Sequence, residues 1–238
     1  MLKMTMAPLP RWQDIFLALL PKTPDDYELS KLWTRDGETG LWLSRSSWAL
    51  LLIVNWYKQV NGQKNLTIWI PDFFCNEALT LIRKSGVNLI FYPVNEQMKI
   101  DVSKCNELAE SNPINIFLLV HYFGEPSPAE CVKELCSNQN TWLIEDATHV
   151  LKPINGIGEI GDIVLYSPHK LLPIPDGSVM VMRPNGPTGL TRNIHAMNLL
   201  PLVLKDIVNS SDNNKKLETI WFFTRVAQKI GIRSRKKN

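Results

Sequence analysis

The chain has 238 residues, a formal net charge of +3, 45% hydrophobic residues and 21% charged residues. This composition excludes a disordered or coiled-coil protein, and the length suits one large domain or two small ones. The longest purely apolar run, Trp48 to Val54, is far shorter than the roughly 20 residues of a membrane-spanning helix. The first residues also lack the apolar core and cleavage site of a secretory signal. We therefore expect a cytoplasmic protein with no membrane or nucleic-acid partner.

Short apolar runs alternate along the chain with segments of helical character. Runs without polar alternation are typical of strands buried on both faces, and their alternation with helices favours βαβ units. We predict an α/β fold with a mostly parallel central sheet flanked by helices. The predicted strands are Leu66–Ile70, Asn88–Tyr92, Ile114–Val120, Thr141–Ile144, Ile163–Tyr166 and Ser178–Met182. The predicted helices are Ser47–Gln59, Asn76–Ser85, Ser103–Ser111, Pro128–Ser137 and Leu217–Ile230.

Two parts are expected along the chain. Residues 1–190 hold the α/β pattern, and residues 191–238 are predicted to form a helical C-terminal part. A basic tail ends this second part, with Arg233, Arg235, Lys236 and Lys237 close together. We interpret the tail as a solvated terminus.

The first candidate site residues are Ser46 and Ser47, which precede the apolar helical run that begins at Trp48. Serine hydroxyls and unpaired backbone N–H groups at a helix start bind anions such as phosphate. The same residues are also common as ordinary helix N-caps. Both interpretations remain open from these residues alone.

Asp146 follows the predicted strand Thr141–Ile144, at the edge where ligands bind in parallel sheets. One interpretation is a metal site with His121 and His149. Another is a fixed carboxylate that pairs with a protonated ring nitrogen of a cofactor. A third is an acid that caps the next helix.

Ser167 and Lys170 follow the next predicted strand, Ile163–Tyr166, in a turn bounded by prolines. The serine can bind an anion, and a lysine in a crevice is the usual nucleophile for a Schiff base with a carbonyl. A surface lysine would give the same local pattern. Together with Asp146 and the serines at 46 and 47, these residues supply the parts of a pyridoxal phosphate site.

The motifs also resemble those of the DegT/StrS-type sugar aminotransferases, a branch of the fold type I pyridoxal-phosphate enzymes. The resemblance runs in family order from about Gly40 to Met182. Fewer residues follow Met182 than the second domain of that family needs. The matching stretches are Ser46–Leu50, Ile70–Cys75, Val120–Pro126, Ile144–His149 and Gly161–Gly177.

The resemblance implies a role for each matching position. Lys170 would form the Schiff base with pyridoxal 5'-phosphate, and Asp146 would pair with its pyridine nitrogen. His149 would lie beside the 3-hydroxyl of the cofactor, and Phe74 would stack on its ring. The phosphate would be held by Ser46, Ser47 and Ser167.

Three functions are therefore considered. The first is an aminotransferase that moves an amino group from glutamate to a nucleotide-linked keto-sugar and works as a homodimer. The second is a truncated or vestigial protein that keeps the fold without the reaction. The third is a metal-dependent hydrolase that uses His121, Asp146 and His149, and it leaves Ser167 and Lys170 without a role.

Overall fold

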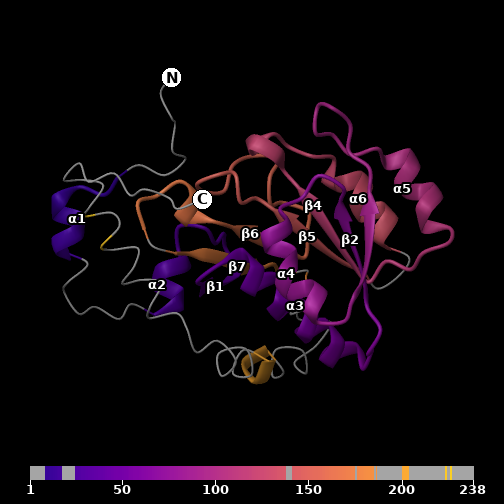
Figure 1. The fold of residues 1–238 in the computed structure, drawn as a ribbon, viewed down its shortest axis with the longest axis horizontal. Helices are drawn as coiled ribbons and strands as arrows, with labels where there is room; N and C mark the ends of the chain where they lie inside the picture. The colour runs from indigo at the N-terminus through magenta and orange to yellow at the C-terminus, as the bar shows by residue number, and fades with distance from the viewer. Residues whose placement is uncertain are drawn as a thin grey trace, which may run out of the picture.

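The structure of the protein is a computed structural model that describes residues 9–17, 25–137, 141–174, 176–184, 186, 200–203, 223 and 226. A seven-stranded sheet runs through its centre, and helices lie on both faces of the sheet (Figure 1). The predicted α/β class with a mostly parallel sheet is confirmed. The predicted division at residue 190 is not tested, because few residues beyond it are described.

The strand order in the sheet is β1-β7-β6-β5-β4-β2-β3. Strand β7 runs antiparallel to β1 and β6, and the other pairs are parallel. The carboxyl ends of all strands except β7 therefore meet at one edge. The strands are β1 (Thr39–Leu43), β2 (Thr67–Pro71), β3 (Asn88–Tyr92), β4 (Ile116–Val120), β5 (Trp142–Asp146), β6 (Ile163–Tyr166) and β7 (Ser178–Met182).

Four predicted helices agree with the structure to within two residues at each end. They are α3 (Ser46–Asn61), α4 (Asn76–Lys84), α5 (Val102–Ala109) and α6 (Ala129–Ser137). The short helices α1 (Trp12–Leu17) and α2 (Asp26–Ser30) were not predicted, nor were strand β1 and the 3₁₀ turns η1 (Tyr122–Gly124) and η2 (Pro168–Lys170). The predicted helix Leu217–Ile230 and the basic tail lie outside the described residues, apart from Phe223 and Val226. Among the described helices, none has the length and apolar character to cross a bilayer.

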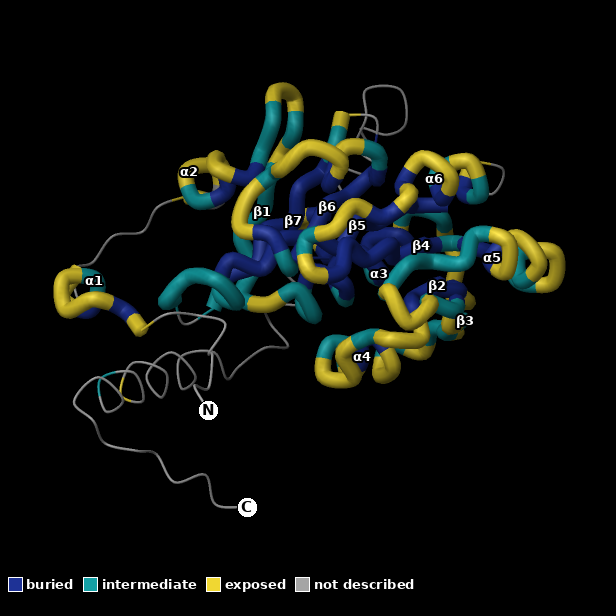
Figure 2. Tube along the Cα trace, turned by 90° about the horizontal axis from the view of Figure 1, so that it is seen from above, coloured by how far each residue is buried: buried dark blue, intermediate teal, exposed yellow. Residues whose placement is uncertain are grey.

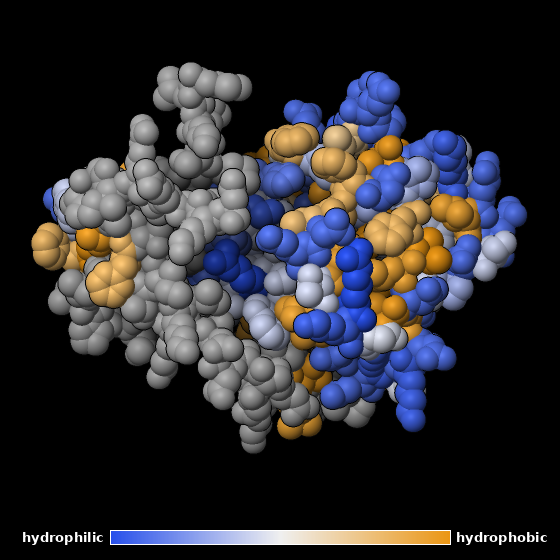
Figure 3. Space-filling model, viewed as in Figure 1, coloured by the Kyte–Doolittle hydropathy of each residue, from blue (hydrophilic) through white to orange (hydrophobic). Residues whose placement is uncertain are grey.

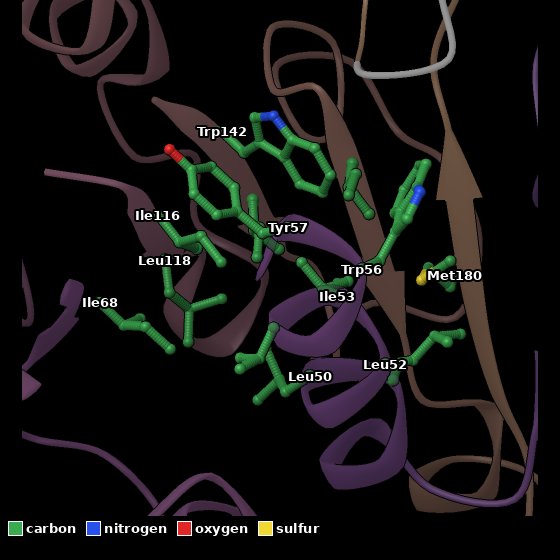
Figure 4. Close-up of a cluster of buried hydrophobic side chains, with 14 of the residues drawn as sticks. Leu50, Leu52, Ile53, Trp56, Tyr57, Ile68, Ile116, Leu118, Trp142 and Met180 are labelled. Carbon is green, nitrogen blue, oxygen red and sulfur yellow. The ribbon is translucent and has the colours of Figure 1, made fainter. Parts of the chain in front are cut away.

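Helix α3 supplies much of the larger core, which lies on one face of the sheet together with α4. The helix ends at Asn61, and its C-cap Gly62 has a φ of 62°, the left-handed conformation of a glycine cap. Near this end, Trp56 and Tyr57 contact the indole of Trp142 edge-on, with ring centroids 4.8 and 4.9 Å apart (Figure 4). Such aromatic pairs stabilise the packing beyond the area that they bury.

The opposite face of the sheet carries two smaller clusters. Helices α5 and α6 cover the first, which includes Trp69 and Phe117. Trp33 and the loop after β5 form the second, next to β6 and β7. Strands β2, β4, β5, β6 and β7 are accordingly buried, and the helices expose their outer sides (Figure 2). Hydrophobic residues also reach the surface among hydrophilic ones on the face seen in Figure 3.

Candidate active site

The predicted site residues lie at the edge where the parallel strands end. Asp146 is the last residue of β5, Ser167 directly follows β6, and Ser44 follows β1. Strands β5 and β6 are neighbours, so Asp146 and Ser167 reach the same part of this edge. In open α/β sheets this is where ligands bind.

Asp146 is almost fully buried, with 6% of its surface exposed. Its Oδ1 accepts a hydrogen bond from the backbone N–H of Thr148 at 3.0 Å. The residues after Asp146 form a turn, so the carboxylate does not cap a following helix. Its second oxygen has no hydrogen bond within the described part of the chain and is available to a ligand.

Lys170 ends the 3₁₀ turn η2, where its backbone N–H donates to the carbonyl oxygen of Ser167 at 3.0 Å. The side-chain Nζ donates to Oγ1 of Thr148 at 2.9 Å. Thr148 therefore contacts Asp146 through its backbone and Lys170 through its side chain. The structure thus brings the predicted carboxylate and the predicted lysine together at Thr148.

Ser167 carries an unusual hydroxyl. The residue has no exposed surface, and its Oγ has no hydrogen-bond partner among the residues that the structure describes. A buried polar atom without a partner costs about 1–3 kcal/mol. Such an atom at the ligand-binding edge of the sheet indicates a group that hydrogen-bonds to it when bound.

Hydrogen bonds through Gly177 connect the Ser167–Lys170 turn to the start of α3. The Gly177 carbonyl lies 2.7 Å from Nδ1 of His169, and its N–H donates to the carbonyl of Ser44 at 2.9 Å. The N-cap of α3 is Arg45, whose side chain makes no capping hydrogen bond. Ser46 and Ser47 are thus the first two helical residues and not the N-cap, so their backbone N–H groups lie at the start of the helix.

His149 lies beside Asp146 and Lys170. Burial and the positive charge of Lys170 lower the pKa of His149, while Asp146 acts in the opposite direction. The Nδ1 atom accepts a hydrogen bond from the backbone N–H of Phe123 at 3.0 Å. The neutral ring therefore carries its proton on Nε2.

The structure reveals two site residues that the sequence analysis missed, Thr148 and Phe123. The ring of Phe123 stacks on His149, with centroids 5.7 Å apart, and it is 75% exposed. Phe123 has a φ of 56° in the turn after β4, a conformation that is rare for a bulky residue. By contrast, the half-buried Phe74, predicted to stack on the cofactor, packs against the larger core.

His121 belongs to a separate buried network. Its Nε2 lies 2.8 Å from Oε2 of Glu145, and its Nδ1 accepts from the N–H of Ser127 at 3.0 Å. Neither of its ring nitrogens is therefore available to a metal shared with Asp146 and His149. No group of three or more potential metal ligands occurs among the described residues.

Glu145 anchors this network from the opposite side of β5, because neighbouring residues of a strand face opposite ways. Its carboxylate also accepts hydrogen bonds from the backbone N–H groups of Gly158, Ile160 and Gly161. Burial raises the pKa of Glu145. The hydrogen bonds from His121 and the backbone amides together lower this pKa by more than burial raises it. The net effect is a pKa below the ordinary value.

Comparison with solved structures shows the same fold in several proteins of known structure. PseC of Helicobacter pylori, an aminotransferase involved in pseudaminic acid biosynthesis, is 18% identical with a TM-score of 0.56, over 74% of this chain and 46% of PseC. The Escherichia coli GDP-4-keto-6-deoxy-D-mannose-3-dehydratase with bound hydrated PLP is 16% identical with a TM-score of 0.57, over 74% and 44% of the two chains.

A third similar structure is NtdA from Bacillus subtilis with bound cofactor PMP. It is 21% identical with a TM-score of 0.54, over 67% of this chain and 36% of NtdA. This chain thus spans less than half the length of these three structures. No curated protein sequence matches it. Residues 49–185, more than half of the chain, match one protein family. The chain belongs to the DegT/DnrJ/EryC1/StrS aminotransferase family.

Proposed function

We propose that this chain is the cofactor-binding part of a pyridoxal-phosphate-dependent aminotransferase. The observation that carries the proposal is the convergence of Lys170, Asp146 and the unpartnered hydroxyl of Ser167 at one edge of the sheet. Family membership and the cofactors bound in two similar structures indicate pyridoxal phosphate. When bound, this cofactor acts as the electron sink for the transfer of an amino group.

The residues at the site suit both ends of this cofactor. Asp146 keeps one carboxylate oxygen for the ring nitrogen, and a nearby anionic oxygen favours the protonated form of that nitrogen. Ser167 offers a buried hydroxyl to the phosphate, and Ser46 and Ser47 offer the first turn of a long helix. His149 presents a donor N–H on Nε2 that we assign to the 3-hydroxyl.

Lys170 has two proposed tasks. Its amine would hold the cofactor by condensing with the cofactor's aldehyde, with loss of water, and as a free amine it would carry a proton between the two reacting carbon atoms. The resemblance assigns ring stacking to Phe74. Phe123, whose exposed ring stacks on His149, is the alternative candidate for stacking on the cofactor ring.

We propose a nucleotide-linked keto-sugar as the amino acceptor and glutamate as the amino donor. The proposal rests on the named neighbours, which include an aminotransferase of pseudaminic acid biosynthesis and a dehydratase of a GDP-linked keto-sugar. From the resemblance we also propose that the chain works as a cytoplasmic homodimer.

The test is an absorbance spectrum of the purified protein with pyridoxal phosphate, followed by borohydride reduction and peptide mass mapping. We expect a visible absorbance band and an adduct on Lys170. Lys170→Ala abolishes the adduct, whereas Lys152→Ala, which changes an exposed lysine of the loop after β5, leaves it intact. Asp146→Ala retains some cofactor but loses amino transfer.

Other outcomes of this experiment contradict the proposal. A reduced adduct in Lys170→Ala would show that another lysine binds the cofactor. Wild-type protein with neither band nor adduct would favour the second hypothesis, a fold that has lost its chemistry.

A further inference from the structure

We propose that Thr148 is a positioning residue that holds the free amine of Lys170 next to Asp146, an inference that rests on the proposed function. Oγ1 of Thr148 accepts a hydrogen bond from Nζ of Lys170 at 2.9 Å, and Thr148 is only 4% exposed. Within the described part of the chain, Lys170 forms no ion pair. The hydroxyl of Thr148 is therefore the group that orients the amine.

The hydroxyl is itself held rigidly. The backbone N–H of Thr148 donates to Oδ1 of Asp146, and the preceding Ala147 donates from its N–H to the carbonyl of Leu165 on β6 at 2.8 Å. A β-branched side chain such as threonine has restricted χ1 rotation. The position of Oγ1 is thus determined by the end of the sheet.

The side chain of Lys170 needs such a hydrogen-bond partner because its four-carbon stem is flexible. A lysine side chain loses more rotamer entropy than most side chains when it is fixed in one conformation. The backbone of Lys170 is held by its hydrogen bond to Ser167, but that bond does not fix the four-carbon stem. One hydrogen bond at the end of the stem selects the conformation that directs the amine into the site.

The positioning also sets the spacing between the two functional groups. Thr148 contacts Asp146 through its N–H and Lys170 through its side chain, so a single residue links the carboxylate to the amine. The lowered pKa of His149, to which the charge of Lys170 contributes, agrees with an amine held on this side. A reacting amine that is already oriented attacks faster than one that must be ordered first.

The experiment compares Thr148→Val with Thr148→Ser. Valine keeps the shape and removes the hydroxyl, and serine keeps the hydroxyl. We measure the rate at which pyridoxal phosphate forms the borohydride-trapped adduct on Lys170 of the full chain, with the urea unfolding midpoint as the check on folding. The attacking amine is uncharged, and a hydrogen bond between uncharged groups is worth about fivefold. We expect the valine variant to be slower by about that factor and the serine variant to lie within about twofold of the wild type.

Thr148→Ala removes the same hydroxyl and is expected to show the same slowing if the valine variant does not fold. Equal rates in the wild type and Thr148→Val would overturn this inference alone. A serine variant as slow as the valine variant, at equal stability, would also overturn it. Absence of an adduct on wild-type Lys170 would overturn the proposed function and this inference together.

Discussion

The substitution Glu145→Gln turns one oxygen of a fully buried carboxylate into an NH₂ group with little change of shape. The remaining oxygen still accepts from the N–H groups of residues 160–161. The new NH₂ group faces two donors, the N–H of Gly158 and Nε2 of His121. His121 cannot move its proton from Nε2 to Nδ1, because Nδ1 accepts from the N–H of Ser127. Two buried donors therefore lose their acceptor.

Each unsatisfied buried donor costs about 1–3 kcal/mol, so the free energy of unfolding should fall by about 2–6 kcal/mol. This loss is a large share of the roughly 5–15 kcal/mol by which a native protein is stable. Urea unfolding followed by tryptophan fluorescence measures it. The control is Glu159→Gln, which changes a side chain that is 43% exposed and pairs with Arg35 at 3.4 Å. An exposed pair contributes about 0–1 kcal/mol. A Glu145→Gln variant no less stable than this control would refute the network.

Two further predictions concern pH and the backbone. Because the folded pKa of Glu145 is lowered, its stabilisation is complete above the unfolded pKa of about 4.3 and is lost as the pH falls through the folded pKa. The wild type should therefore lose more stability than Glu145→Gln on acidification below about pH 4.3, and parallel curves of urea midpoint against pH would contradict this. Gly177 has a φ of 141°, and a Cβ there would lie 2.6 Å from a ring carbon of Trp42. Gly177→Ala should lower the free energy of unfolding by about 1–3 kcal/mol or more. Gly62→Ala, at a φ of 62° and with nothing within 4 Å of the new Cβ, is the comparison without a steric clash and should cost less.

Much of the sheet was predictable because its strands are apolar on both faces. The runs Asn88–Tyr92, Ile163–Tyr166 and Ser178–Met182 form strands over the predicted residues. Strand β1 was not predicted, since most of its residues are only half-buried and its partner β7 lies far along the chain. Pairing between distant segments leaves no local pattern, so the strand order and the antiparallel β7 also required the structure.

The candidate site was also predictable only in part from the sequence. The sequence by itself placed Ser167 and Lys170 after a strand and Asp146 near the end of another, because a buried strand is visible as an apolar run and its end as the first polar residues. Asp146 proved to be the last residue of β5 and not a residue beyond it. Only the tertiary structure decided which side chains meet there. It directs His121 into a network with Glu145, packs Phe74 against the core and places Thr148 between Asp146 and Lys170. The physical reason is that side-chain direction depends on strand alternation and on turns, and contacts depend on which strands become neighbours.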